Sequence, residues 1–347
     1  MNTTTRKQIT VGGVPIGGGA PVVVQSMTST KTGDIPATVA QIHRLEAAGC
    51  ELIRLAVPDL AAAHALAQIK EQIHIPLVAD IHFDYRLALE SAAAGADGIR
   101  INPGNIGDDD RVRQVAAACT GRGLPIRIGV NGGSLERDIV AKFGHTPEAM
   151  VESALYHTAL LNRFDFDDIC LSVKSSSVPD TVAAYRLLHS RTSYPLHLGV
   201  TEAGTAYMGT VKSAIGIGSL LLDGIGDTIR VSLTDDPAEE IKAARAILQS
   251  LGLRRFGPNI VSCPTCGRCN IDLIPLAREV EQRLADSTRE ITVAVMGCAV
   301  NGPGEASAAD FGIAGGAGEG LLFRHGETVG KVPMDRLVDA LMEMIAQ

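Results

Sequence analysis

The sequence predicts an α/β protein in which a TIM-type (β/α)8 barrel is followed by a small α+β domain. Short apolar runs alternate with segments of helical spacing eight times over roughly the first 245 residues, as a closed parallel barrel requires. Hydrophobic residues make up 46% of the 347 residues, which is enough for a large core. Aromatic residues reach only 3% beside 37 glycines, and such a small-residue interior suits helices packed on a parallel sheet. A doubly wound open sheet is the alternative.

The eight apolar runs are the predicted barrel strands, at residues 22–26, 52–57, 77–83, 99–102, 126–130, 169–173, 196–200 and 229–233. Between the first two, Val39, Ile42 and Leu45 share one helical face, and Gly49 is suited to end that helix. Four runs contain the dipeptide Ile-Arg, at residues 53–54, 99–100, 126–127 and 229–230. This weak repeat indicates one supersecondary unit reused around a ring.

The second domain begins after a predicted helix that starts at Pro237 and ends near Gly252. We place the boundary at residue 250, so that residues 1–250 form the barrel and 251–347 the second domain. The second domain is expected to contain a cysteine segment, a helix over 273–284, a strand over 291–296, two strands near 311–314 and 320–323, and a terminal helix from Met334.

Composition excludes several classes of protein. The formal charge of −8 argues against a surface that binds nucleic acid over its whole extent. No apolar run approaches the ~18 residues that would span a bilayer, so no membrane association is expected. The N-terminal residues lack the apolar stretch of a signal peptide, and we therefore expect a cytoplasmic protein.

Basic residues on the predicted barrel strands indicate an anion site. A charged side chain inside an apolar strand is costly unless it is paired, and the carboxyl ends of barrel strands converge on one mouth. Guanidinium groups suit phosphate oxygens, and a diphosphate-sized ligand would account for the whole set, which comprises Arg54, Arg100, Arg127, Arg230 and Lys174. The alternative is that each arginine pairs privately with a carboxylate such as Asp80 or Glu202.

Other polar side chains occupy similar strand ends. Asn102 stands two residues after Arg100 and should share its face, as Ser232 does with Arg230. Asn131 ends another run. Glu202 is a candidate proton donor, and His82 a candidate donor or acid. For each of these polar residues, loop capping or hydrogen bonding within the barrel top is the competing interpretation.

Four of the seven cysteines gather near the C-terminus and indicate a metal centre. Cys263, Cys266 and Cys269 lie in one tight turn, and Cys298 follows after a helix and a strand. An iron–sulfur cluster fits this spacing, and a structural zinc site on the four thiols is the alternative. Spacing does not decide whether a fourth cysteine or Glu305 completes a cluster. The remaining cysteines, Cys50, Cys119 and Cys170, are expected to be buried small hydrophobes.

Six segments resemble the 4-hydroxy-3-methylbut-2-enyl diphosphate synthase (IspG/GcpE) family, the iron–sulfur enzymes of the non-mevalonate isoprenoid pathway. The resemblance covers essentially the whole chain, and the last segment is highly specific. The segments are IGGGAP…VQSMT (16–28), INPGNIG (101–107), GVNGGSL (129–135), LGVTEAG (198–204), CPTCGR (263–268) and MGCAVNGPGE (296–305).

The resemblance implies a TIM barrel that binds a cyclic diphosphate, followed by a reductase-like domain with a 4Fe-4S cluster. It implies cluster ligands at Cys263, Cys266, Cys298 and Glu305, whereas Cys269 falls where the family pattern needs no cysteine. It assigns substrate binding to Arg54, Arg100, Asn102, Arg127, Asn131, Lys174, Arg230 and Ser232, and catalysis to His82, Glu202 and Glu305.

The activity implied is reductive ring opening and dehydration of 2-C-methyl-D-erythritol 2,4-cyclodiphosphate to 4-hydroxy-3-methylbut-2-enyl diphosphate. Reduced flavodoxin or ferredoxin would donate the electrons. A homodimer would bring the cluster domain of one subunit over the barrel mouth of the other. Two alternatives stay open, namely an enzyme like sulfite or nitrite reductase, which would need a sirohaem, and a zinc-stapled scaffold without catalysis.

Overall fold

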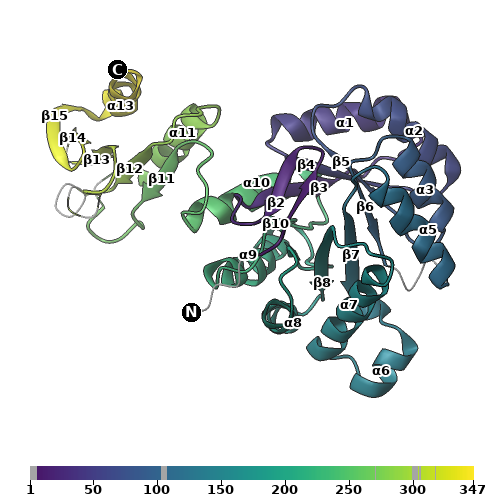
Figure 1. The fold of residues 1–347 in the computed structure, drawn as a ribbon. Coiled ribbons are helices and arrows are strands. Elements are labelled where there is room, and N and C mark those ends of the chain that lie inside the picture. The colour runs from purple at the N-terminus through teal and green to yellow at the C-terminus, as the bar shows by residue number, and fades with distance from the viewer. Residues whose placement is uncertain (1–5, 103–107, 270, 299–303, 305, 317) are drawn as a thin grey trace. The chain divides into compact units, whose positions relative to one another are not determined.

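The computed structural model describes residues 6–102, 108–269, 271–298, 304, 306–316 and 318–347 (Figure 1). The chain divides into two compact units, Met1–Arg254 and Arg255–Gln347, and each is described by itself. Among the described residues, no helix combines the length and apolar character needed to cross a membrane.

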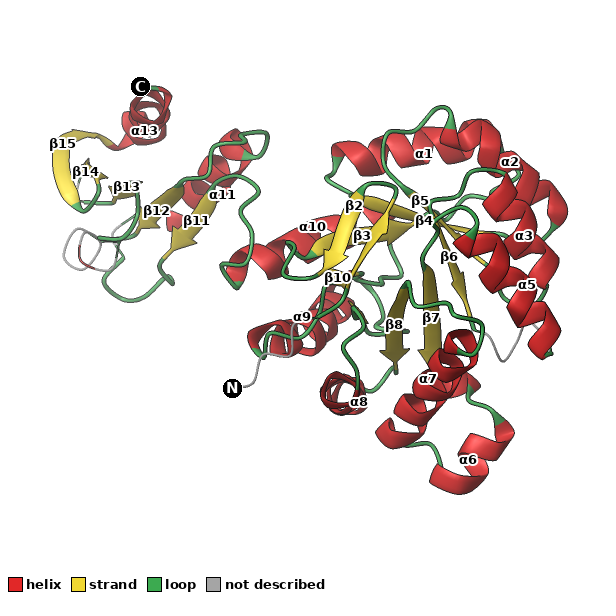
Figure 2. Ribbon diagram, in the orientation of Figure 1, coloured by secondary structure: helices red, strands yellow, loops and turns green. Residues whose placement is uncertain are grey.

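The first unit is a parallel barrel surrounded by helices (Figure 2). Its strands follow the order β8-β7-β6-β5-β4-β3-β10-β9, and a parallel bridge between Leu171 and Leu196 closes the ring. The barrel prediction is therefore confirmed, and the open sheet is excluded. The strands are β3 (Val23–Met27), β4 (Leu52–Ala56), β5 (Leu77–Asp80), β6 (Gly98–Ile101), β7 (Ile126–Asn131), β8 (Ile169–Lys174), β9 (His197–Leu198) and β10 (Thr228–Ile229).

A helix follows every barrel strand, and most of these helices begin at a polar side chain that caps the first turn. Such a cap satisfies a backbone N–H that has no partner within the helix. Asp34 accepts a hydrogen bond from the Ala37 N–H, and Ser177 from the Asp180 N–H. The helices are α1 (Ile35–Ala47), α2 (Leu60–Lys70), α3 (Tyr85–Ala93), α5 (Asp109–Thr120), α6 (Arg137–Phe143), α7 (Pro147–Asn162), α8 (Val178–Arg191), α9 (Ala206–Leu222) and α10 (Pro237–Ser250), with a short 3-10 turn at Gly132–Ser134.

Three strands are shorter than their apolar runs by three residues each, and this changes where polar side chains lie. The run at 77–83 is a strand only as far as Asp80, so His82 lies beyond it. The last two strands, β9 and β10, have two residues each, and Arg230 follows β10 directly. The Arg230 N–H still donates to Leu198 O at 3.0 Å, so the hydrogen-bond ladder holds that arginine in place.

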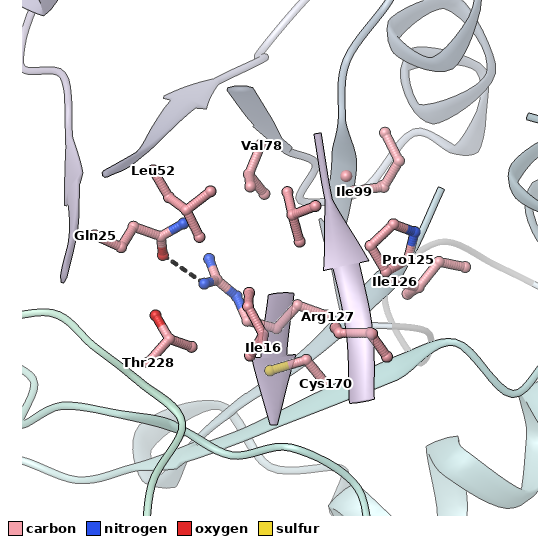
Figure 3. A pocket seen from close by; sticks show the side chains of 13 residues that line it. Ile16, Gln25, Leu52, Val78, Ile99, Pro125, Ile126, Arg127, Cys170 and Thr228 are labelled. Atoms are coloured by element: carbon pink, nitrogen blue, oxygen red, sulfur yellow. Dashed lines mark hydrogen bonds between the residues drawn. The ribbon is translucent and has the colours of Figure 1, made fainter. Parts of the chain in front are cut away.

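An N-terminal hairpin, which the sequence analysis did not predict, closes one end of the barrel. Strands β1 (Gln8–Val11) and β2 (Val14–Gly17) pair around Gly12 and Gly13, whose positive φ angles suit a two-residue turn. Apolar side chains of the hairpin pack on residues near the beginnings of the barrel strands. Figure 3 shows the apolar pocket at this end, with the Arg127 guanidinium reaching Gln25 inside it.

The second unit is a five-stranded sheet with the order β11-β12-β13-β14-β15. The first three strands are parallel and the last two antiparallel. Side chains of both helices pack with Val293 and Val295 in one core. The elements are β11 (Asn259–Ser262), α11 (Leu273–Leu284), β12 (Thr292–Met296), β13 (Phe311–Ala314), β14 (Glu319–Arg324), β15 (Glu327–Pro333), a 3-10 turn (Met334–Arg336) and α13 (Leu337–Ala346).

Candidate active site

The carboxyl ends of the barrel strands surround a polar cavity of about 200 Å³. Its position follows from the fold, because all eight strands end at this face and their loops converge there. Eight residues named from the sequence line it, together with five others. The lining residues are Met27, Arg54, Asp80, His82, Arg100, Arg127, Gly129, Asn131, Ser172, Lys174, Thr201, Arg230 and Ser232.

Positive charge exceeds negative charge in this cavity. Four arginines and one lysine line it, with Asp80 as the single carboxylate among the lining residues that the structure describes. Asp80 is shared between two arginines, at 3.4 Å from Arg54 and 3.1 Å from Arg100. Burial alone would raise the Asp80 pKa, but these guanidinium groups outweigh it and hold that pKa below its usual value. One carboxylate thus serves two cations, and private pairing does not account for the set.

The other two arginines are held from outside the cavity lining. Arg230 pairs with Glu240 at 3.2 Å, a buried residue of α10 that the sequence analysis did not identify. Arg127 donates to the side-chain oxygen of Gln25, which carries no charge. Its Nη2 is buried and has no hydrogen-bond partner among the described residues. Burial lowers the Arg127 pKa to about 10. A buried donor without an acceptor is one that a bound anion or an ordered water would satisfy.

Lys174 is a buried cation among four arginines. It ends β8, and its side chain has no hydrogen bond or ion pair to any residue that the structure describes. Burial lowers its pKa well below the usual value, and the guanidinium groups of Arg54 and Arg127 lower it further. An anion bound beside Lys174 would reverse this effect, since an opposite charge favours the protonated amine.

Two glycines make room for these long side chains, and the sequence analysis did not assign them a role. A Cβ atom on Gly129 would lie 2.4 Å from Arg100 Nε, and one on Gly199 would lie 2.8 Å from Lys174 Nζ. The signal was present in the sequence as glycine within an apolar strand, which often marks a close approach by another group.

Gly129→Ala is expected to displace the Arg100 guanidinium from Asp80 and from Gly129 O, which it contacts at 3.1 Å. Because a misplacement of ~1 Å at a binding group can cost about 100-fold, we expect kcat/KM for an anionic substrate to fall by that order. Steady-state kinetics measure it. Gly218→Ala is the control, because a Cβ there meets nothing within 4 Å. An unchanged kcat/KM in Gly129→Ala would contradict the role given to Arg100.

The remaining candidate residues lie in three different places. Asn131, Ser232 and His82 line the cavity, with His82 Nε2 at 3.8 Å from Asp80 Oδ2. Asn102 is buried after β6 but is not among the lining residues. Glu202 lines a neighbouring cavity that shares Asn131 and Thr201 with the first. Its φ of +52° lies in the left-handed region, and such strain is frequent at functional sites.

The cysteines of the second unit are gathered by its parallel strands. Cys263 directly follows β11, and Cys298 lies two residues after the neighbouring strand β12. The Gly297 N–H donates to Cys263 Sγ at 3.1 Å, which places the two strand ends together. Ligands in open sheets commonly bind beyond the carboxyl ends of parallel strands.

The other two thiols differ in their surroundings. Cys266 is exposed, and hydrogen bonds from the Arg268 backbone and side chain lower its pKa, favouring the thiolate that binds metals. Cys269 is half-buried, donates to Ile271 O at 3.2 Å and packs against Gly297. Glu305, the fourth ligand implied by the resemblance, lies outside the described residues.

The described thiol positions do not reproduce the spacing of a zinc site, and cysteine thiolates are a donor set that an iron–sulfur cluster accepts. In a zinc site with Zn–S bonds of ~2.3 Å, sulfurs lie ~4 Å apart. Among the described residues, no three of the four C-terminal sulfurs lie within 4.8 Å of one another. A hydrogen bond from a backbone N–H to a ligand sulfur is also a usual feature of iron–sulfur sites. The three scattered cysteines are buried, as predicted.

Two family models cover nearly the whole chain. The GcpE TIM-barrel domain matches residues 6–245, and the GcpE protein C-terminal domain matches residues 259–347. The chain belongs to the GcpE family. The resemblance stated from the motifs is thereby confirmed.

Close relatives of this GcpE-family chain carry one enzyme name. The 4-hydroxy-3-methylbut-2-en-1-yl diphosphate synthase (flavodoxin) of Geobacter sulfurreducens is 60% identical over 343 residues, which is 99% of this chain and 97% of that protein. The protein of the same name from Ruminiclostridium cellulolyticum is 58% identical, over 98% of this chain and 97% of its own length.

Solved structures show a more distant likeness to this GcpE-family chain. Dihydropteroate synthase from Stenotrophomonas maltophilia matches with a TM-score of 0.52 and 14% identity, over 71% of this chain and 98% of that chain. A dihydropteroate synthetase with bound product matches with a TM-score of 0.51 and 14% identity, over 72% of this chain and 100% of that chain. At this identity the likeness concerns the fold alone.

Proposed function

We propose that the chain reductively converts 2-C-methyl-D-erythritol 2,4-cyclodiphosphate to 4-hydroxy-3-methylbut-2-enyl diphosphate, the product that its relatives' name gives. The observation that carries this proposal is the barrel cavity, where five cations face one carboxylate. Among the described residues, the Lys174 ammonium has no partner and the Arg127 Nη2 has no acceptor. Such a cavity suits a small ligand with two phosphates. The relatives at 58–60% identity are named for a diphosphate product, which supports this assignment.

The reaction consumes two electrons and one proton. One C–O bond of the ring breaks and its oxygen stays on the phosphate as an anion, while a hydroxyl takes the proton and leaves as water. The diphosphate therefore gains one negative charge as the ring opens. Lys174 and the four arginines, which line the cavity, would stabilise the charge that develops as the ring opens, and stabilising such a charge is what accelerates a reaction.

Glu202 and His82 are the proposed sources of the proton. His82 lines the cavity, with its Nε2 at 3.8 Å from the Asp80 carboxylate. Glu202 lies in the adjoining cavity, and its strained backbone holds the carboxyl beside Asn131 and Thr201. We propose Glu202 as the acid, because its cavity adjoins the diphosphate site without competing for the arginines.

The second unit would hold a 4Fe-4S cluster through Cys263, Cys266, Cys298 and Glu305. When bound, this cluster would supply the electrons and an iron that acts as a Lewis acid. The Gly297 N–H would hold the Cys263 sulfur in place. Flavodoxin is the proposed electron donor, because the relatives' name includes it. A homodimer and a cytoplasmic location stay predictions.

Anaerobic purification followed by iron and sulfide analysis tests the proposal. We expect about four iron and four sulfide per chain and a broad visible absorbance. Turnover of the cyclodiphosphate is expected with reduced flavodoxin, and a parallel assay with ferredoxin tests donor choice. A sirohaem spectrum would indicate the reductase-like alternative, and a colourless protein that retains zinc would indicate the scaffold. Either result, or absence of turnover by cluster-loaded protein, would overturn the proposal.

A further inference from the structure

A second group of potential metal ligands lies at the opposite end of the barrel from the cavity. His43 and Glu46 are one turn apart on α1, and His74 lies in the loop before β5. One ligand atom of each lies within 4.8 Å of the other two, and within the described part of the chain no other three His, Cys, Asp or Glu side chains meet this spacing. Since α1 leads into β4 and the loop leads into β5, the group sits where barrel strands begin.

The Glu46 carboxylate is fixed by the loop that it faces. Its Oε1 accepts hydrogen bonds from the His74 N–H at 2.7 Å and from the Ile75 N–H at 3.2 Å. Its Oε2 lies 3.0 Å from His74 Nδ1. With metal–ligand bonds of ~2.1 Å, two ligands at right angles lie about 3 Å apart, so this pair already has the required separation.

One nitrogen of the His43 ring is held by a backbone carbonyl. Its Nε2 lies 2.7 Å from the carbonyl oxygen of Gln72, which only accepts hydrogen bonds. Nε2 therefore carries the proton, and Nδ1 keeps a lone pair. Metal-ligating histidines commonly donate their other N–H to a backbone carbonyl in this way. An ion pair between Glu46 and His74 would account for those two residues but not for the placement of His43.

We propose that His43, Glu46 and His74 bind a late first-row divalent cation such as Zn²⁺, with water in the remaining positions. Two imidazoles and one carboxylate suit this class of ion better than Mg²⁺ or Ca²⁺, which prefer oxygen ligands. The two histidines are exposed, so their rings can close around the ion without repacking a core. The bound ion would link α1 to the loop at 71–76. This site is independent of the proposed reaction.

Cobalt titration of untagged, full-length, cluster-loaded protein tests this site. Co²⁺ bound by imidazole and carboxylate shows only weak visible bands, whereas Co²⁺ bound by thiolate adds strong near-ultraviolet charge-transfer absorbance, so the two kinds of site are told apart. We expect one Co²⁺ per chain without the thiolate signal.

His43→Gln and His74→Gln are the test variants, and His64→Gln is the matched control. His64 is another exposed histidine beside a carboxylate, Glu90 at 3.5 Å, but it has no second imidazole. Loss of a residue that only hydrogen-bonds to a metal ligand costs about 10- to 100-fold in metal affinity. Loss of a ligand itself is expected to weaken Co²⁺ binding by more than this. His64→Gln should bind as wild type does. Equal binding by all four proteins, or binding with the thiolate signal alone, would overturn the proposal while leaving the proposed function unaffected.

Discussion

Cys266→Ala is expected to lose most of the iron and sulfide of the anaerobically purified protein, and with them its turnover of the cyclodiphosphate. Cys266 is exposed, and its thiol is biased toward the thiolate by the Arg268 hydrogen bonds, so it has little other structural use. The proposed cluster would be held by three cysteines, and a neighbouring side chain could replace a lost thiolate only if the turn rearranged. Iron content should fall from about four atoms per chain toward zero while the melting temperature of the barrel stays unchanged.

Cys269→Ala is the matched control, because it removes a second thiol from the same turn. Cys269 donates to Ile271 O and packs against Gly297, so it already has a structural role. We expect the variant to keep its iron, sulfide and visible absorbance, with a small loss of stability from the lost packing. Loss of iron from Cys269→Ala to the same extent as from Cys266→Ala would make Cys269 a ligand and exclude the assignment of Glu305.

Most of the barrel could be predicted because its physical signal is local. A parallel strand buried on both faces reads as a continuous apolar run, and a charged residue inside it stands out. Arg54, Arg100 and Arg127 were found in this way, and all three line the cavity. Arg230 was found although it lies just beyond its strand, since it is adjacent in sequence to the buried Ile229.

What the sequence did not reveal depends on contacts between distant segments. Glu240 is buried by its pairing with Arg230, but in the sequence it appears as one of several acids in the first turn of α10. Gly129 and Gly199 leave room for Arg100 and Lys174, which come from other strands, so their role depends on contacts that the local sequence does not contain. Strands β11 and β15 were missed because most of their residues are exposed, so neither forms an apolar run.

Lys174→Met is expected to make the ligand-free protein more stable and less active. The lysine is buried beside four arginines, and replacing it with an apolar side chain of similar shape removes a cation that no described acceptor pairs with. The same change removes a charged donor to the diphosphate. A hydrogen bond to a charged group is worth ~1.5–3 kcal/mol, so kcat/KM should fall about 10- to 150-fold. Thermal melts and steady-state kinetics measure the two effects.

The gain in stability should depend on pH in a defined direction. Because the pKa of Lys174 is lowered in the folded protein, the unfolded chain binds more protons between that pKa and the ordinary value of 10.5. Stability of the wild type therefore rises with pH across this window. Lys174→Met lacks the group, so its advantage in melting temperature should be greatest below the lowered pKa and should vanish above 10.5. An advantage that stays constant with pH would show that packing, not charge, is its source.

Lys242→Met separates these effects from the general loss of a lysine. Lys242 is exposed on α10 and pairs with Glu239 at 2.7 Å, an arrangement worth less than ~1 kcal/mol. Neither its melting temperature nor its kcat/KM is expected to change appreciably. Comparing the two variants therefore separates the effect of removing an exposed, paired lysine from the effect of removing a buried lysine without a described partner. If Lys174→Met lowered stability, or left kcat/KM unchanged, the barrel cavity would not be the diphosphate site.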